Sequence, residues 1–243
     1  MSPRITAATV ARVLAQVRHD KRTIALLLVV PSVLLWLVRE MLGPVAFDRL
    51  GGPMLGMFPF ITMFLVTSIA MLRERTTGTL ERLMTMPLAK LDLLGGYGIA
   101  FALLATLQAL VTSAVVFVAL GLDTAGAAWL IAALAVLNAV LGSALGLLAS
   151  AFASTEFQAV QFMPAIVLPQ VLLCGLLVPL EQMAAGLEAV ASVLPLTFAF
   201  EALDEVAVGG GGLGDVGGEI GVLVGICALA LALGALTLRR RTA

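Results

Sequence analysis

The most charged stretch of the chain lies at residues 73–88. Its charged side chains carry both signs: Arg73, Glu74, Arg75, Glu81 and Arg82. Among them, Leu80, Leu83 and Met84 would share one face of a short helix that Pro87 ends. Such a helix is too polar for lipid, and its leucines need another surface to cover them. The chemistry expected here is docking, with carboxylates meeting basic groups on a second, soluble protein. A charged hairpin that only fixes the topology is the alternative.

Six long apolar stretches position this segment and indicate an all-α integral membrane protein. The 243 residues are 61% hydrophobic and 12% charged, and a soluble globule of that composition would expose large apolar patches. A helix needs about 20 residues to cross about 30 Å of hydrocarbon. We expect one transmembrane domain over 1–243, with spans at 23–38, 54–72, 98–120, 127–151, 158–179 and 219–238.

The basic residues predict the orientation of these spans. With the N terminus inside, twelve of the 14 Lys and Arg residues fall on the cytoplasmic side, and only Arg39 and Arg49 fall outside. Ten of the 15 acidic residues lie outside in the same threading. The positive-inside rule therefore favours cytoplasmic N and C termini and a cytoplasmic segment 73–97.

The sequence lacks the residues that would let this chain use an ion gradient or ATP by itself. None of the six apolar cores carries Asp, Glu, Lys, Arg or His, whereas ion-coupled carriers place such groups at membrane depth. Neither Lys21 nor Lys90 stands in a phosphate-binding glycine loop. The single histidine, His19, is expected on a polar helix face, and Cys174 and Cys227 as apolar core residues. Energy must therefore come from another chain, and no cofactor is expected in this one.

Two further segments flank the spans. Residues 1–22 predict a helix lying in the membrane interface, because Val10, Val13, Leu14 and Val17 recur at helical spacing; a merely basic topogenic tail is the alternative. The external piece 180–218 is too long for a turn, and we expect it to form two short re-entrant helices that act as a lid, followed by a glycine-rich linker.

Polar and helix-breaking residues within the spans indicate where helices meet. We expect Gln108, Asn138, Gln158, Gln161 and Gln170 chiefly to form hydrogen bonds between helices, with substrate contact as the alternative. Pro164 and Pro169 should kink span five. The glycine pairs at 142 and 146 and at 221 and 225 permit close helix contacts, although such spacing is common in glycine-rich spans.

Three stretches in the same order along the chain resemble the permease subunits of type-2 ABC exporters. The first is 73–88, which is similar to the family's coupling segment with its Gly-Thr-Leu-Glu-Arg-Leu core. The second runs from Leu168-Pro169 to Cys174-Gly175, Pro179 and Met183, and the third is Leu194-Pro-Leu-Thr-Phe198 with Glu201-Ala-Leu203. Cys174 replaces a common Ser, Ala184-Ala185 replaces a usual Pro, and Asp204 stands where a basic residue is frequent.

The resemblance implies a six-helix permease in a bacterial inner membrane that pairs with itself or a close relative. It implies two cytoplasmic ATPase subunits that bind ATP and Mg, and no nucleic acid as partner. The substrate would be apolar or amphipathic, such as a drug, a lipid or a lipid-linked glycan, and would be exported by alternating access. The residues expected to couple to the ATPase are Glu74, Arg75, Thr79, Leu80, Glu81, Leu83 and Pro87. Those expected to line the substrate cavity are Phe60, Phe64, Met163, Ile166, Val167 and Gln170, and those of the external gate are Pro179, Glu181, Pro195, Thr197 and Glu201.

Two other classes of function remain open from the sequence. A stand-alone secondary carrier or channel would be favoured by an inverted repeat and a buried ionisable residue, neither of which is found. A membrane scaffold that anchors an ATPase without transport would share the docking segment. A copurifying ATPase would argue against the carrier, and stimulation of that ATPase by substrate would argue against the scaffold.

Overall fold

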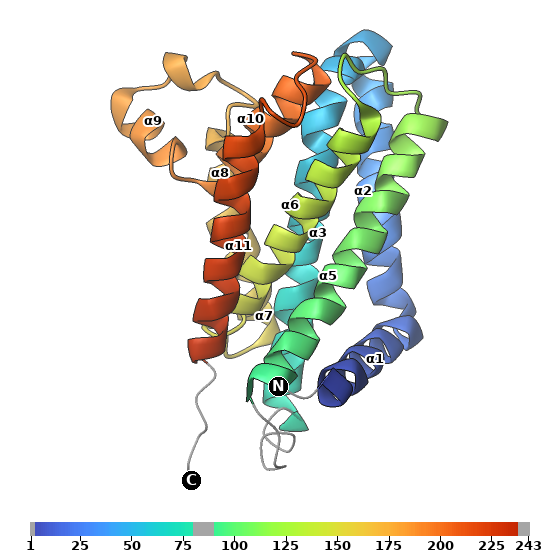
Figure 1. Cartoon of the computed structure of the whole chain (residues 1–243), viewed down its shortest axis with the longest axis vertical. Helices are drawn as coiled ribbons and strands as arrows, with labels where there is room; N and C mark the ends of the chain where they lie inside the picture. The colour runs from blue at the N-terminus through green and yellow to red at the C-terminus, as the bar shows by residue number, and fades with distance from the viewer. Residues whose placement is uncertain (1–2, 80–89, 238–243) are drawn as a thin grey trace.

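A computed structural model describes residues 3–79 and 90–237, and every regular element in these ranges is a helix. Six of its helical segments are long and apolar enough to cross a membrane, which confirms the all-α membrane fold. They run roughly side by side (Figure 1). Their bounds are α2 Lys21–Leu42, α3 Pro44–Thr76, α5 Lys90–Ala114 with the π-helix Val115–Ala119, α6 Ala128–Ala149, the broken helix Glu156–Leu173, and α11 Gly217–Thr237.

Helices α3 and α6 form the centre of the bundle. In each, 67% of the most apolar window is buried, against 17% in α2, the broken helix and α11. A Cβ on Gly142 would lie 2.3 Å from the Phe60 carbonyl oxygen, and one on Gly146 would lie 2.5 Å from that of Phe64. The two backbones can approach this closely only because these residues lack a side chain. A Cβ added at Gly221 or Gly225 would meet no other part of the described protein within 4 Å.

Span five is broken in the region that the prolines predicted. It consists of α7 Glu156–Phe162, a π-helical turn Met163–Val167 and α8 Leu168–Leu173. Pro164 lies within the π-helical turn, and Pro169 within the first turn of α8. Because proline cannot donate a backbone hydrogen bond, the regular ladder is interrupted there.

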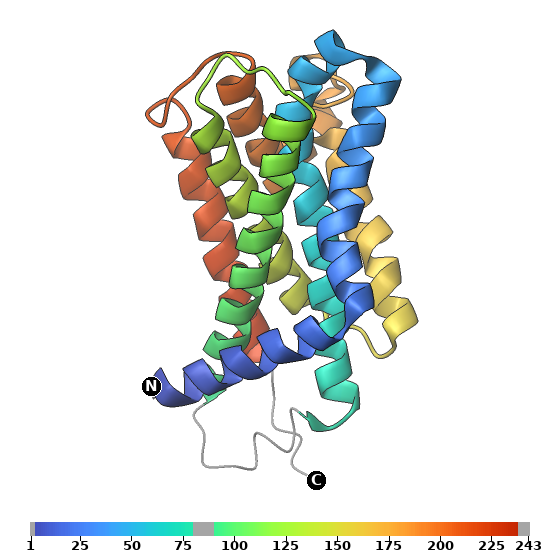
Figure 2. The ribbon, with the colours of Figure 1, turned by 90° about the vertical axis from the view of Figure 1, so that its right-hand side faces the viewer.

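Helix α1, Pro3–His19, lies across one end of the bundle (Figure 2). The side chains of Val10, Val13, Leu14 and Val17 pack against the protein core, with Val13 buried. The segment expected to be helical over 1–22 thus contains a helix that ends at His19, while Lys21 and Arg22 begin α2, and the apolar side of α1 packs on the bundle. We call this end, where α3 finishes and α5 starts, the α1 end.

The opposite end, which we call the α10 end, carries the segment expected to form a lid. A short 3₁₀ turn, Leu180–Gln182, precedes α9, Ala185–Ala191, and α10, Pro195–Ala207. Helices α9 and α10 meet at 83°. Two short helices are thus found in 180–218, as the sequence predicted. One side of α10 is buried in the bundle, with Leu196, Ala202 and Leu203 nearly inaccessible.

Candidate functional site

A cluster of polar side chains at the α1 end joins three helices, and we call it the α1 junction: Arg12, Gln16, Glu74 and Tyr97. Arg12 of α1 donates from Nη1 to both carboxylate oxygens of Glu74, each at 3.2 Å. Gln16 Nε2 donates to the same carboxylate at 3.0 Å, and the Tyr97 hydroxyl of α5 donates to it at 2.7 Å. Arg12 also donates to the Tyr97 hydroxyl. The carboxylate of Glu74 is therefore the shared acceptor of α1 and α5.

Within the α1 junction, Arg12, Glu74 and Tyr97 are largely withdrawn from solvent, whereas Gln16 is exposed. The Glu74 side chain is 12% exposed and that of Arg12 is 29% exposed. Burial alone would lower the pKa of Arg12, but the Tyr97 hydroxyl and the Glu74 carboxylate raise that pKa above its ordinary value. The guanidinium carbon also lies 5.4 Å from the centre of the Tyr97 ring, within reach of a cation–π interaction. Breaking one member of such a pair leaves the other buried and unpaired, which costs more than a surface pair would.

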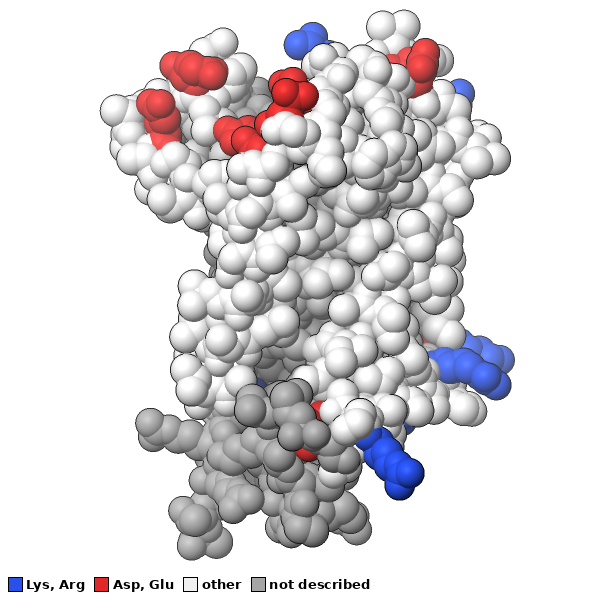
Figure 3. Space-filling view, viewed as in Figure 1, with Lys and Arg blue, Asp and Glu red and all other residues white. Residues whose placement is uncertain are grey.

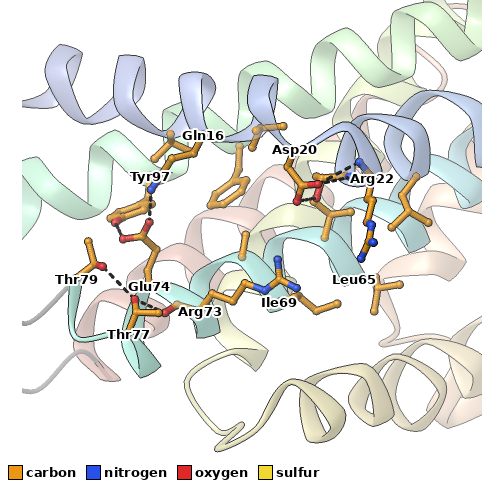
Figure 4. Close-up of a pocket in the computed structure, with 17 residues that line it drawn as sticks. Gln16, Asp20, Arg22, Leu65, Ile69, Arg73, Glu74, Thr77, Thr79 and Tyr97 are labelled. Atoms are coloured by element: carbon orange, nitrogen blue, oxygen red, sulfur yellow. Dashed lines mark hydrogen bonds between the residues drawn. The ribbon is translucent and has the colours of Figure 1, made fainter.

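Beside the α1 junction lies a cavity of about 800 Å³ between α1, α2, α3 and α5 (Figure 4). One side of it is polar, with Gln16, Asp20, Arg22 and Arg73. Asp20 caps α2 and accepts hydrogen bonds from the Thr23 hydroxyl at 2.8 Å and the Thr23 amide at 3.3 Å, which lower the pKa of this carboxyl group. Its apolar wall is formed deeper in the spans by residues such as Leu26, Leu65 and Ile69.

The residues expected to contact an ATPase are only partly described. Glu74 accepts hydrogen bonds from within its own chain, in place of the partner's basic group that the sequence suggested. Arg75 lies in the last turn of α3 and donates to the Ser150 carbonyl at the end of α6, at 3.4 Å. The Thr79 hydroxyl shares a hydrogen bond with that of Thr77, at 3.0 Å. Leu80, Glu81, Leu83 and Pro87 lie outside the described residues.

The residues expected to line a substrate cavity fall into two groups. Phe60 and Phe64 are 0% and 1% exposed, and they share one apolar cluster with Val167 at 1%. Met163 packs against the same cluster, and the Gln170 amide donates to the Ile166 carbonyl of its own helix at 3.0 Å. Of these six residues only Ile166, at 40% exposed, lies at the surface of the chain.

The residues expected at an external gate meet at the α10 end. Pro179, Glu181 and Glu201 line a cavity of about 530 Å³ together with Arg49 of α3. Pro195 is the first residue of α10, where its missing amide hydrogen costs nothing, and Thr197 is buried in the same first turn. The structure therefore brings three of the five side chains to one cavity and assigns the other two to the start of the helix that forms its wall.

Three side chains hold Glu74 that the sequence did not point to: Arg12, Gln16 and Tyr97. None of the three was given a contact, and Tyr97 is the only tyrosine of the chain. A signal was available, because a phenol near the start of an apolar helix needs a hydrogen-bond partner. Within the described residues, no group of three or more His, Cys, Asp or Glu is placed to hold a metal ion.

One predicted polar contact between spans is present. The Gln108 side chain of α5 donates to the Thr62 hydroxyl of α3, and both residues are buried. Gln158 instead accepts from the Ser154 amide at 2.8 Å, ahead of its own helix. Polar side chains in these spans therefore serve both helix packing and helix ends.

Comparison with known proteins assigns the chain to a family. Its residues 5–207 match the model of the ABC-2 type transporter family. It is 29% identical over 143 residues to the probable multidrug ABC transporter permease YbhR of Escherichia coli, in both strain K12 and O157:H7, covering 59% of this chain and 39% of the relative. It is 25% identical over 166 residues to ABC transporter G family member 20 of Dictyostelium discoideum, covering 68% of this chain and 23% of the relative. The matched part spans less than half the length of each relative. Because the family model covers most of its residues, this chain belongs to the ABC-2 type transporter family.

Proposed function

We propose that the chain is the membrane-spanning subunit of an ATP-driven exporter. The observation that carries this proposal is the family match over residues 5–207. The sequence contains no nucleotide-binding loop, so ATP and Mg would be bound by two separate ATPase subunits below the α1 end. A second permease, the same chain or a close relative, would complete the membrane part about a two-fold axis.

We propose that the α1 end faces the cytoplasm of a bacterial inner membrane. Figure 3 supports this orientation, because acidic side chains gather at the α10 end and several basic ones at the α1 end. In the sequence, α11 is followed closely by three basic residues, Arg239 to Arg241. The positive-inside rule favours this arrangement.

Site-specific labelling tests the orientation. A single cysteine at Thr79 or Thr242 should react with a membrane-impermeant maleimide only after the cells are opened, and one at Asp215 should react in intact cells. Labelling of Thr79 from outside intact cells would reverse the proposed topology.

The proposed mechanism assigns the transmitting role to the α1 junction. Helix α3 leads directly into the charged segment expected to dock the ATPase, and Glu74 joins the last turns of α3 to α1 and α5. A movement of that segment on ATP binding would therefore pull α1 and α5 with it. The spans would rock from an inward-open to an outward-open arrangement, driven by the difference in nucleotide affinity between the two states.

The proposed substrate is apolar or amphipathic. One matched relative is named as a probable multidrug permease, and the middle of the bundle offers no charged side chain to pair with an ionic group. Phe60 and Phe64 are buried within this chain, so neither faces an open pathway in a single copy. A substrate pathway would instead form between this chain and the second permease. Ile166, which is exposed on span five, is the best placed of the expected cavity residues to face it.

Purification from native membranes tests the function. The tagged chain should retain a stoichiometric ATPase subunit whose hydrolysis rises with amphipathic compounds such as ethidium, while the chain expressed alone should hydrolyse no ATP. Dye transport by the chain alone in vesicles would favour a carrier. A retained ATPase that no compound stimulates, with no transport in vesicles, would favour a scaffold.

A further inference from the structure

The cavity beside the α1 junction is lined by two facing stripes, one on α2 and one on α3. On α2, Arg22 and Leu26 are four residues apart and share one helix face; on α3, Arg73, Ile69 and Leu65 follow each other at the same spacing. In both stripes the charged residue lies toward the α1 end and the apolar residues lie deeper in the span. The polarity of the two walls therefore changes in the same direction along the membrane normal.

Most of the charges around the cavity are already satisfied. Arg73 donates to both carboxylate oxygens of Glu156, at 2.7 and 3.1 Å. Glu74 is held by the α1 junction, and Asp20 caps α2. Among the described residues, no carboxylate pairs with the guanidinium of Arg22. Figure 4 shows the Arg22 and Arg73 side chains directed toward the same space between α2 and α3.

The deeper part of the cavity is apolar and accessible. Leu26 is 44% exposed, and Leu65 and Ile69 are half-buried, so these side chains present surface that the protein itself does not cover. A soluble anion would satisfy Arg22 but leave this surface to water. A hydrocarbon chain would cover it but leave Arg22 without a counter-charge. A ligand that satisfies both parts has an anionic head and an apolar tail.

We propose that this cavity binds one membrane phospholipid from the leaflet at the α1 end, with its phosphodiester on Arg22 and an acyl chain along Leu26, Leu65 and Ile69. Arginine is well suited to phosphate oxygens because its guanidinium presents several donors in one plane. The volume of about 800 Å³ accommodates a headgroup and part of a chain. The lipid is held within one protomer, so the inference is independent of the exported substrate.

The lipid would stand where it can influence the α1 junction. Gln16, Glu74 and Tyr97 line the same cavity and also belong to that junction. A bound lipid would therefore fill the space between α1 and the α2–α3 pair and favour this arrangement of the three helices.

Native mass spectrometry of the detergent-purified chain tests the proposal with dioleoylphosphatidylglycerol as the probe. The wild-type chain should retain one such lipid, and Arg22→Gln should weaken its retention about tenfold, the effect expected for losing a charge-assisted hydrogen bond. The matched control is Arg18→Gln: Arg18 is exposed at the same end, as Arg22 is, but lies outside the cavity lining. It should retain the lipid within about twofold of wild type.

Two added ligands separate the head from the tail. Glycerol 1-phosphate and dioleoylglycerol carry one part each, and both should compete with the phospholipid far more weakly than unlabelled phosphatidylglycerol does. Competition by glycerol 1-phosphate equal to that of the lipid would replace the proposal by a soluble-anion site. Equal losses in Arg18→Gln and Arg22→Gln, or no lipid retained by the wild-type chain, would overturn it. A Leu26→Asn variant provides a second check, because it should weaken lipid retention while leaving Arg22 intact.

Discussion

Two contacts of helix α3, one with α6 in the middle of the bundle and one with α1 and α5 at the α1 end, use different chemistry. Against the middle of α6, Gly142 and Gly146 let the backbones touch at the Phe60 and Phe64 carbonyl groups, which are uncharged. At the α1 junction, one carboxylate collects three side-chain donors from two other helices. Two helices whose backbones touch can pack in one relative position only, whereas a carboxylate can give up one hydrogen-bond donor and accept another. We therefore expect α3 and α6 to move together as a rigid body, and α1 and α5 to be able to shift relative to α3 at the α1 junction.

The largest effect should come from filling the α3–α6 contact. Leucine at position 142 would drive its Cβ into the Phe60 carbonyl oxygen, at 2.3 Å, and even one extra methylene in a packed core costs about 1–3 kcal/mol. We expect Gly142→Leu to abolish the monodisperse peak in size-exclusion chromatography. Gly221→Leu is the matched control, because nothing lies within 4 Å of that position, and it should elute as wild type. A folded Gly142→Leu protein would contradict the rigid centre.

Emptying the same contact should have the next largest effect. Phe64→Ala would leave a cavity beside α6, and we expect the free energy of unfolding to fall by about 3 kcal/mol. This is the low end for a buried phenylalanine, because the lipid around the bundle is as apolar as its core and adds no hydrophobic driving force between helices. Thermal unfolding in detergent measures it. Ile166→Ala, at an exposed position of span five, should leave the melting temperature unchanged. If Phe64→Ala had normal stability but lost the stimulation of ATP hydrolysis by substrate, Phe64 would instead be a residue that contacts substrate.

The smallest effect should come from the exposed ion pair between α3 and α7. Arg73 and Glu156 are 54% and 52% exposed, and pairs of this kind contribute about 0.2–1 kcal/mol. Glu156→Gln should therefore lower the melting temperature only slightly, and less at high salt than at low salt. A loss as large as that of Phe64→Ala would show that charge, as well as packing, holds the last turns of α3 against α7.

The sequence predicted the spans well because length and apolarity alone determine them. All six expected stretches overlap the observed helices, and Pro164 marked the break in span five. It did not give the length of α3, which extends from Pro44 through Arg73 to Thr76. Charged residues in a last helical turn cost little where they reach the membrane surface or a buried partner, so hydropathy ends a span too early.

The contacts between helices could be predicted only in part. The same spacing of glycines occurs at 142 and 146 and at 221 and 225, yet only the first pair touches another backbone, because a pattern does not say which helix it faces. Arg12 and Glu74 are 62 residues apart, and each alone resembles an ordinary surface charge. Their pairing depends on α1 folding back under the bundle, which no local pattern encodes.

A double-mutant cycle at the α1 junction tests the central claim most directly. Substrate-stimulated ATP hydrolysis would be measured on the assembled complex for Arg12→Gln, Glu74→Gln and the two together, with Arg18→Gln as the control. If Arg12 and Glu74 act as one joint, each single change should reduce the stimulation and the double change should reduce it no further, with a coupling energy of about 1–3 kcal/mol. Additive losses, or full stimulation in both single variants with normal assembly, would contradict the α1 junction as the connection between the ATPase side and the spans.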